Sequence, residues 1–157
     1  MTSGADRLQD REDIRVLISR SVRFLDEARF ADFIGLFAPE GRYALQADSP
    51  EIGQSMTWLD LDRGELEALL EESPQHVHDL AARKHMVTVE EIDFTADAAE
   101  VLSNFSVFRT DIDGRTDVYA VGRYEDELAR AGEAWHIVNR RVMVQTRMFR
   151  TPTPTPL

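Results

Sequence analysis

The C-terminal third of the sequence, residues 101–149, most constrains how the chain can fold. It contains three long runs of strand-like character, and two turn signals separate them. The first turn is Asp111-Ile112-Asp113-Gly114, and the second is Ala131-Gly132-Glu133. Because Asp-Gly between alternating runs is a strong hairpin signal, these residues predict an antiparallel meander. Such a sheet has an apolar face that another layer must cover.

Two helices are predicted before the first strand. The first should begin at Asp10, because aspartate caps helices well and the acids that follow it suit the helix dipole. The apolar positions that recur at helical spacing in this segment are Ile14, Leu17, Ile18, Val22 and Leu25. A second apolar face over residues 30–37 predicts a short helix that Pro39 and Gly41 end.

The remaining elements complete an α+β pattern. Residues 62–72 predict a third helix that Pro74 closes, and residues 42–47 predict a first strand. Residues 48–55 contain Pro and Gly and predict a loop, and residues 84–94 predict the strand ahead of the meander. The order is therefore helix, helix, strand, helix and four strands. This order indicates helices on one face of a curved antiparallel sheet.

The chain is predicted to form one domain over residues 1–157, which is long enough for one hydrophobic core. Residues 1–9 are polar and should be frayed, whereas residues 10–149 should form the α+β unit. Residues 150–157 contain alternating Thr and Pro, and we call them the Thr/Pro tail. Since proline donates no backbone hydrogen bond, we expect this tail to be extended.

Composition excludes several classes of function. The net charge is -11, which argues against a nucleic acid partner because phosphate binding needs clustered Lys and Arg. The absence of cysteine excludes disulfides, thiolate nucleophiles and Cys-ligated iron–sulfur clusters within these residues. No run approaches the roughly 20 apolar residues of a membrane span, and the first residues lack a signal-peptide pattern. These features predict a cytoplasmic protein without a membrane partner.

Arginines and a tryptophan in the meander predict an interface. Both faces of the last run carry a mixture of apolar and charged residues, with Arg141 and Arg147 assigned to the face of Trp135 and Arg140 to the other. Helices should cover one face and another chain the other, since interface cores favour Trp and Arg. The predicted interface residues are Arg109, Arg123, Trp135, Arg140, Arg141 and Arg147. The alternative is a solvated sheet face with ordinary cross-strand ion pairs.

His76 and His78 form a His-x-His pair next to Asp79. In a strand this spacing would place both imidazoles on one face, as a metal site requires. The segment follows Pro74 and has a loop-like composition, so we interpret the histidines as a solvated pair. We therefore predict no metal site and no bound cofactor in this chain.

Three segments of the meander carry a family resemblance. They are residues 103–109 (SNFSVFR), 122–128 (GRYEDEL) and 135–142 (WHIVNRRV), together with the upstream residues 83–88 (RKHMVT). These segments resemble the β (small) subunit of aromatic-ring-hydroxylating dioxygenases. That resemblance implies a cystatin-like α+β cone of the nuclear transport factor 2-like superfamily, which agrees with the predicted order of elements.

The resemblance also implies a function. A β subunit of this family mainly supports assembly of a Rieske non-haem iron oxygenase that acts in aromatic compound catabolism. The large (α) oxygenase subunit carries the Rieske cluster and the mononuclear iron, so this chain would hold no catalytic centre. The implied partners are that α subunit and further copies of this chain, as a homotrimer within a complex of three copies of each subunit.

A different function stays open because of His85. This residue shares a strand face with Val87 and Val89, so it could be a general base inside the cone. Asp26 at the end of the first helix and Tyr43 on the first strand are its candidate partners. The alternative function is therefore a stand-alone dehydratase or cyclase. The competing interpretation is a buried histidine with a structural role, and fold alone assigns no chemistry.

Overall fold

The computed structural model describes residues 4–76, 79–149, 151, 156 and 157. The described helices are α1 (Gly4–Asp26), α2 (Phe30–Gly35) and α3 (Arg63–His76). The described strands are β1 (Phe37–Ser49), β2 (Gln54–Asp62), β3 (Ala82–Thr95), β4 (Ala98–Thr110), β5 (Thr116–Ala131) and β6 (Ala134–Val144).

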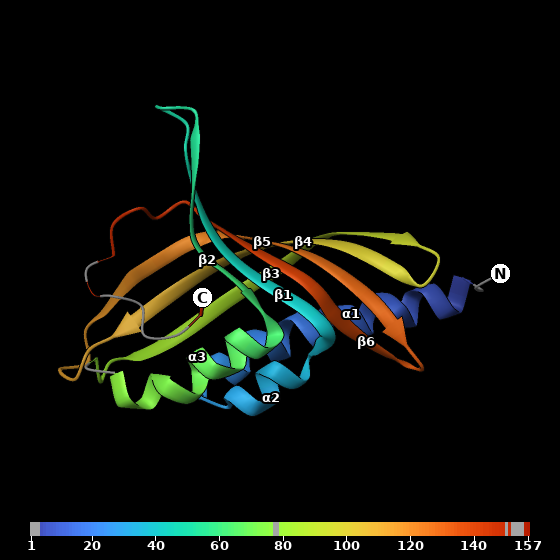
Figure 1. Ribbon diagram of the computed structural model, residues 1–157, viewed down its shortest axis with the longest axis horizontal. Coiled ribbons are helices and arrows are strands. Elements are labelled where there is room, and N and C mark those ends of the chain that lie inside the picture. The colour runs from blue at the N-terminus through green and yellow to red at the C-terminus, as the bar shows by residue number, and fades with distance from the viewer. Residues whose placement is uncertain (1–3, 77–78, 150, 152–155) are drawn as a thin grey trace.

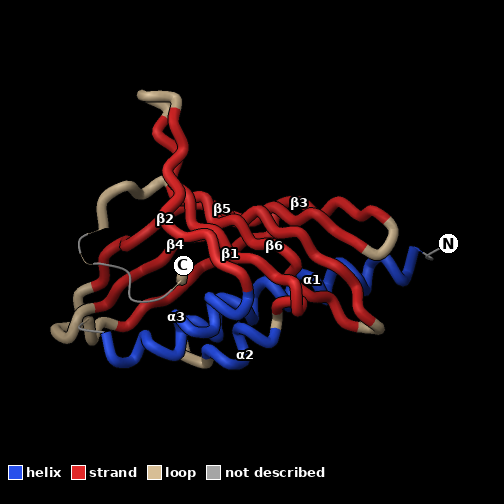
Figure 2. Tube along the Cα trace, viewed as in Figure 1, coloured by secondary structure: helices blue, strands red, loops and turns tan. Residues whose placement is uncertain are grey.

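All described strands belong to one sheet with the order β2-β1-β6-β5-β4-β3. β1 runs parallel to β6, and the other neighbouring strands are antiparallel. The sheet is curved, and the helices lie along one face of it (Figures 1 and 2). This arrangement confirms the predicted α+β class. None of the described helices combines the length and the apolar character that a membrane span requires.

The β1–β2 hairpin differs most from the prediction. β1 continues to Ser49, and a short turn then leads into β2, which was not predicted. β2 is an edge strand whose side chains are mostly exposed or half-buried, so its sequence lacks the alternation that marks a half-buried strand. The end of this hairpin projects away from the rest of the sheet, at the top of Figure 1.

The helix bounds also differ from the prediction. α1 begins at Gly4, so Asp10 is not a helix cap. Its carboxylate is buried and accepts hydrogen bonds from the Arg130 guanidinium and the Trp135 indole. α2 ends before β1 begins at Phe37, which places Pro39 and Gly41 in a strand, and α3 includes Pro74. Tertiary contacts therefore override the local stop signals.

The meander of β4, β5 and β6 forms as predicted, with both turns in place. Gly114 and Gly132 have φ angles of 83° and 67°, which favour glycine. In the first turn, the Asp111 carboxylate accepts hydrogen bonds from the backbone N–H groups of Asp113 and Arg115. Within β5, a Cβ atom at Gly122 would collide with the Met143 carbonyl oxygen, so glycine is required in this Gly-Arg segment.

A bulge in β6 changes which residues share a face. Glu127 pairs with Asn139 and Leu128 pairs with Ile137, so Val138 is an extra residue in β6. The bulge reverses the alternation, and Trp135 and Arg140 both point toward the helices. The predicted assignment of Trp135 to the face of Arg141 is therefore wrong. Arg147 also lies beyond β6 rather than within it.

The core contains one fully buried ion pair. The Arg140 guanidinium on β6 donates hydrogen bonds of 2.7 and 2.8 Å to the two carboxylate oxygens of Asp126 on β5. Its third bond, of 2.9 Å, reaches the Ser21 hydroxyl on α1. Both charged side chains are 0% exposed. Burial alone would lower the pKa of Arg140, but the Asp126 carboxylate offsets this and raises it above its ordinary value. This group joins the sheet to the helix layer.

Removal of either partner of this pair should be strongly destabilising. We expect Arg140→Met to reduce the free energy of unfolding by about 3–5 kcal/mol, because the Asp126 carboxylate is then buried without its counter-charge. Urea unfolding followed by circular dichroism measures this loss. The matched control is Arg42→Met, which removes an exposed pair with Asp60 and should change stability little. Equal effects of the two substitutions would contradict the prediction.

Candidate functional site

The inner face of the sheet holds a direct contact between His85 and Asp26. The His85 Nδ1 atom lies 2.6 Å from an Asp26 carboxylate oxygen, and the His85 backbone N–H donates to the same carboxylate at 2.9 Å. Both side chains are less than 10% exposed. Because the carboxylate only accepts, it favours the tautomer with the proton on Nδ1. The Nε2 atom is then a buried acceptor, and it has no partner among the described residues.

Two tyrosines on the same inner face are fully buried. Tyr43 on β1 donates to the main-chain oxygen of Leu157 at 3.1 Å and accepts from the Leu157 N–H at 3.0 Å. The Tyr124 hydroxyl on β5 has no partner among the described residues, and its ring stacks on Phe105 with centroids 4.4 Å apart. Burial raises the pKa of each of the two phenols well above the ordinary value of a tyrosine. Both are therefore protonated near neutral pH.

The structure brings some of the predicted catalytic residues together and separates others. His85 and Asp26 are in contact, as the enzyme alternative requires. Among the described residues, Tyr43 is hydrogen-bonded to Leu157 and has no hydrogen bond to His85. The interior is also closed, since Tyr43 and Tyr124 are 0% exposed and Leu157 is 1% exposed. The sequence pointed to the pair of His85 and Asp26 but not to the contact between Leu157 and Tyr43.

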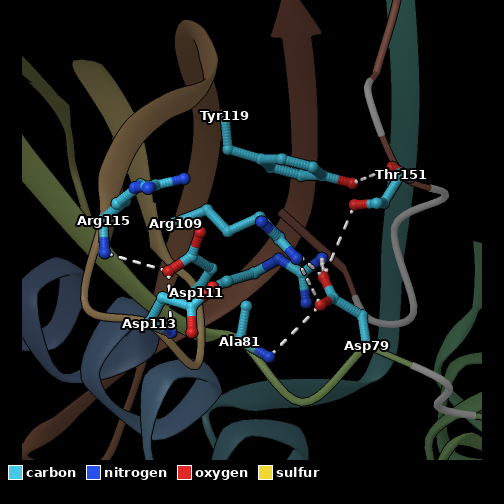
Figure 3. A network of polar contacts seen from close by, with 9 residues as sticks. Asp79, Ala81, Arg109, Asp111, Asp113, Arg115, Tyr119 and Thr151 are labelled. Carbon is cyan, nitrogen blue, oxygen red and sulfur yellow. Dashed lines mark hydrogen bonds and ion pairs between the residues drawn. The ribbon is translucent and has the colours of Figure 1, made fainter.

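A second polar network lies near the contact between His85 and Asp26, where β3 begins and β4 ends (Figure 3). The Asp79 carboxylate accepts two hydrogen bonds from Arg109 on β4, at 2.7 and 2.9 Å, and one of 3.0 Å from Arg83 on β3. Thr151 also contacts it, and the Thr151 carbonyl oxygen accepts a bond of 2.6 Å from the Tyr119 hydroxyl. The hydrogen bonds from Arg109 hold the pKa of Asp79 well below its ordinary range. Asp79 therefore joins the β3–β4 pair to the Thr/Pro tail.

This network bears on two predictions. Arg109 is hydrogen-bonded to Asp79 within the chain. Its predicted place in an interface with another chain stays a prediction. Asp79 pairs with arginines and was not singled out as a partner for them, because its sequence position next to the histidines gave no such signal. The His76 and His78 side chains lie outside the described residues. Among the residues that the structure describes, no group of three or more His, Asp or Glu side chains is arranged to hold a metal ion.

The outer face of the sheet, opposite the helices, carries Arg123 and Arg141 of the predicted interface residues, whereas Arg147 lies beyond the end of β6. Arg123 and Arg141 both bind the Glu125 carboxylate on this face, and Arg147 forms a bidentate pair with Glu51. Burial alone would raise the pKa of Glu125, but Arg141 and Arg123 lower it below its ordinary value. Trp135 and Arg140 face the helices instead. The predicted interface set is therefore divided between the two faces of the sheet.

A groove of about 350 Å³ opens beside Glu125 on this face. We call it the acidic groove. The side chains that characterise it are Glu91, Asp93, Glu100, Glu125, Glu127, Asn139 and Arg141. Among the described residues, four of these acids (Glu91, Asp93, Glu100 and Glu127) form no hydrogen bond or ion pair through their side chains. The groove is therefore a surface of uncompensated negative charge.

Comparison with known proteins identifies the family. Residues 6–141 match the SnoaL-like domain. The β subunit of the methanesulfonate monooxygenase hydroxylase from Methylosulfonomonas methylovora is 30% identical over 139 residues, which cover 80% of this chain and 77% of that protein. The β subunit of 2-aminobenzenesulfonate 2,3-dioxygenase from Alcaligenes sp. is 20% identical over 149 residues, which cover 94% of this chain and 99% of that protein.

A solved structure agrees with these relatives. A protein from Novosphingobium aromaticivorans, classed as the β subunit of an aromatic-ring-hydroxylating dioxygenase, superposes with a TM-score of 0.79. The match covers 90% of this chain and 93% of that one at 18% identity, so it supports the cone-shaped fold. Together with the two relatives, it confirms the resemblance seen in the meander. The chain therefore belongs to the SnoaL-like domain family and, within it, to the β subunits of ring-hydroxylating oxygenases.

Proposed function

We propose that this chain is the small subunit of a Rieske non-haem iron oxygenase and that it supports assembly with a large catalytic subunit. The family supports this role, because the most similar relatives described above are β subunits of multisubunit oxygenases. The Rieske cluster and the mononuclear iron belong to the large subunit in this proposal. The complex would act in aromatic compound catabolism in the cytoplasm, with three copies of each subunit.

The observation that carries the proposal is the uncovered outer face of the sheet. The helices lie on the other face, so nothing among the described residues covers this one (Figure 1). Farther along the strands, beyond the row of Asn104 and Arg123, the same face exposes an apolar patch of Met86, Val118 and Val121. Met86 and Val121 both pair with Ser106 of β4, so they lie in one row across the sheet. Exposed apolar residues on a sheet face that also carries a charged groove are typical of a protein interface.

Charge complementarity indicates how the large subunit binds. The acidic groove should receive a surface of the large subunit that carries Lys or Arg. Arg123 and Arg141 share the Glu125 carboxylate, so this carboxylate offsets part of their charge and they fix its position. Trp135 and Arg140 contribute indirectly, because they hold β6 against α1 through Asp10 and Ser21. Arg109 and Arg147 lie outside the groove and have no assigned contact in this proposal.

The first test is co-expression with a large oxygenase subunit from the same genome. We expect the two subunits to co-purify in equal amounts, and iron to be absent from this chain when it is isolated alone. Glu100→Lys combined with Glu127→Lys should weaken the complex about tenfold or more, because like charges then face each other across the interface. Sedimentation or interferometry measures the affinity.

The matched control for this test is Asp113→Lys together with Glu133→Lys. These substitutions make the same change in charge at the exposed β4–β5 and β5–β6 turns, outside the groove. The control should bind as the wild type does. Equal weakening by the two double variants would show a general charge effect and contradict docking at the groove. Stoichiometric iron in the isolated chain would contradict the absence of a metal centre.

The contact between His85 and Asp26 favours a second candidate, a dehydratase or cyclase. Asp26 orients the imidazole through Nδ1 and leaves Nε2 as a general base that faces the interior. The buried Tyr124 hydroxyl could donate to a developing negative charge on a substrate oxygen. This candidate requires the interior to open, since its polar groups are shielded from solvent in the structure.

His85→Gln distinguishes the two candidates. In an assembly subunit it should lower the free energy of unfolding by about 1–3 kcal/mol, because the buried Asp26 carboxylate loses a donor. The rate of hydroxylation per assembled complex should stay unchanged, as measured by product formation at a known iron content. A dehydratase or cyclase would instead lose its activity with the general base. Loss of turnover at unchanged assembly would therefore contradict a purely structural role.

A further inference from the structure

The exposed side of α1 carries two arginines that pair with no carboxylate among the described residues. Residues 15–23 of this helix contain Arg15, Arg20 and Arg23 and no acid. Arg23 lies 3.8 Å from the Glu27 carboxylate, whereas the exposed Arg15 and Arg20 form no hydrogen bond or ion pair in the part of the chain that the structure describes. Two unbalanced positive charges therefore lie on one helix of a chain whose net charge is -11.

These two arginines flank a strip without charge. Successive residues turn by about 100° around a helix, so Val16 and Ser19 lie between Arg15 and Arg20 on the exposed side. Val16 is exposed, although most apolar side chains of α1 are buried in the core. We call Arg15, Val16, Ser19 and Arg20 the basic face of α1. It presents two cations about 7.5 Å apart along the helix axis, with an apolar side chain between them.

A groove of about 390 Å³ between α2 and α3 has the opposite charge. We call it the helix groove. Phe30, Ile34 and Leu70 give it an apolar lining, and Glu67 and Glu71 line it from α3. Both carboxylates are exposed and form no hydrogen bond or ion pair among the described residues. They are one turn apart, about 6 Å along the helix, which is close to the spacing of the two arginines.

Arg29 also lines the helix groove, but carboxylates outside the groove compensate its charge. Its guanidinium donates hydrogen bonds of 2.8 Å to Asp32 and 3.3 Å to Glu27. The groove therefore combines an apolar lining with two negative charges that are available to a partner.

We propose that the basic face of α1 docks in the helix groove of a second copy of this chain. Arg15 and Arg20 of one copy then face Glu67 and Glu71 of the next, and Val16 contacts the apolar lining. Charge complementarity sets which surfaces meet and in which orientation, and the apolar contact at the centre excludes water.

Each copy carries both surfaces in its helix layer, where α2 packs against α1 and against α3 (Figure 1). A contact between two different surfaces is head-to-tail, and such contacts close into a ring when the rotation between copies allows it. The inference rests on the homotrimer of the proposed function, and it names the surfaces that join the three copies. The outer face of the sheet stays free for the large subunit.

Reversal of charge on either surface should separate the copies. We expect Glu67→Arg with Glu71→Arg, and likewise Arg15→Glu with Arg20→Glu, to weaken self-association at least tenfold, because like charges then meet across the contact. Sedimentation equilibrium of the isolated chain measures this affinity. In the wild type the affinity should also fall as salt concentration rises.

The matched control is Asp113→Arg with Glu133→Arg. It changes the net charge as the α3 reversal does, but at exposed turns outside both surfaces. The control should associate at least as tightly as the wild type, because it only reduces the overall negative charge. Equal weakening by the control and by the α3 reversal would contradict docking at the helix groove.

A variant with all four reversals, on α1 and on α3, gives the decisive measurement. Its charges are exchanged but still complementary, so its affinity should return to within threefold of the wild type. A loss of fold would not be rescued in this way. A wild type that stays monomeric at low salt, unchanged association of both double variants, or no recovery in the combined variant would overturn the proposal.

Binding of the large subunit is measured separately. The outer face is unchanged in all these variants, so each should still co-purify with that subunit. A wild type that fails to bind the large subunit contradicts the assembly role. Failure of the present inference shows instead in the mass of the isolated chain, which is measured without the large subunit.

Discussion

The buried pair of Arg140 and Asp126 is the interaction on which the rest of the structure depends. It joins β6 to β5, and the bond to Ser21 brings α1 into the same group. A charged pair without solvent contact is stable only when its hydrogen bonds are well formed. The position of the helix layer on the sheet is therefore tied to the register of these two strands. The bulge at Val138 places Arg140 on the inner face, where this pair can form.

The sheet separates two chemical environments. Its inner face combines the buried ion pair with the His85–Asp26 contact and two buried tyrosines, and the helices shield this face from solvent. Its outer face exposes an acidic groove and apolar side chains with no covering layer among the described residues. The proposed role in assembly would use the outer face, whereas the enzyme alternative would use the inner one. Because the two faces alternate residue by residue along each strand, one sheet can serve both purposes.

The sequence predicted the meander well because its signals are local. The glycines of the two turns adopt positive φ angles, and the strands between them alternate in burial. The contact between His85 and Asp26 was also foreseen, since one residue ends the first helix and the other lies at the start of a strand. β2 was missed because an exposed edge strand has little periodicity. The bulge in β6 was missed because one inserted residue leaves no mark in composition.

The sequence by itself determined the α+β class, the two turns of the meander and the family segments around Asn104, Gly122 and Trp135. These properties follow from short-range patterns and from residue types, such as the glycines of the turns, that particular backbone conformations require. Only the tertiary structure decided which charges are buried, since the bulge at Val138 places Arg140 together with Trp135 on the inner face. It also decided that Leu157 enters the interior and that Asp79 binds Arg109. Such contacts join residues far apart in the chain, and no local pattern encodes the distance between them.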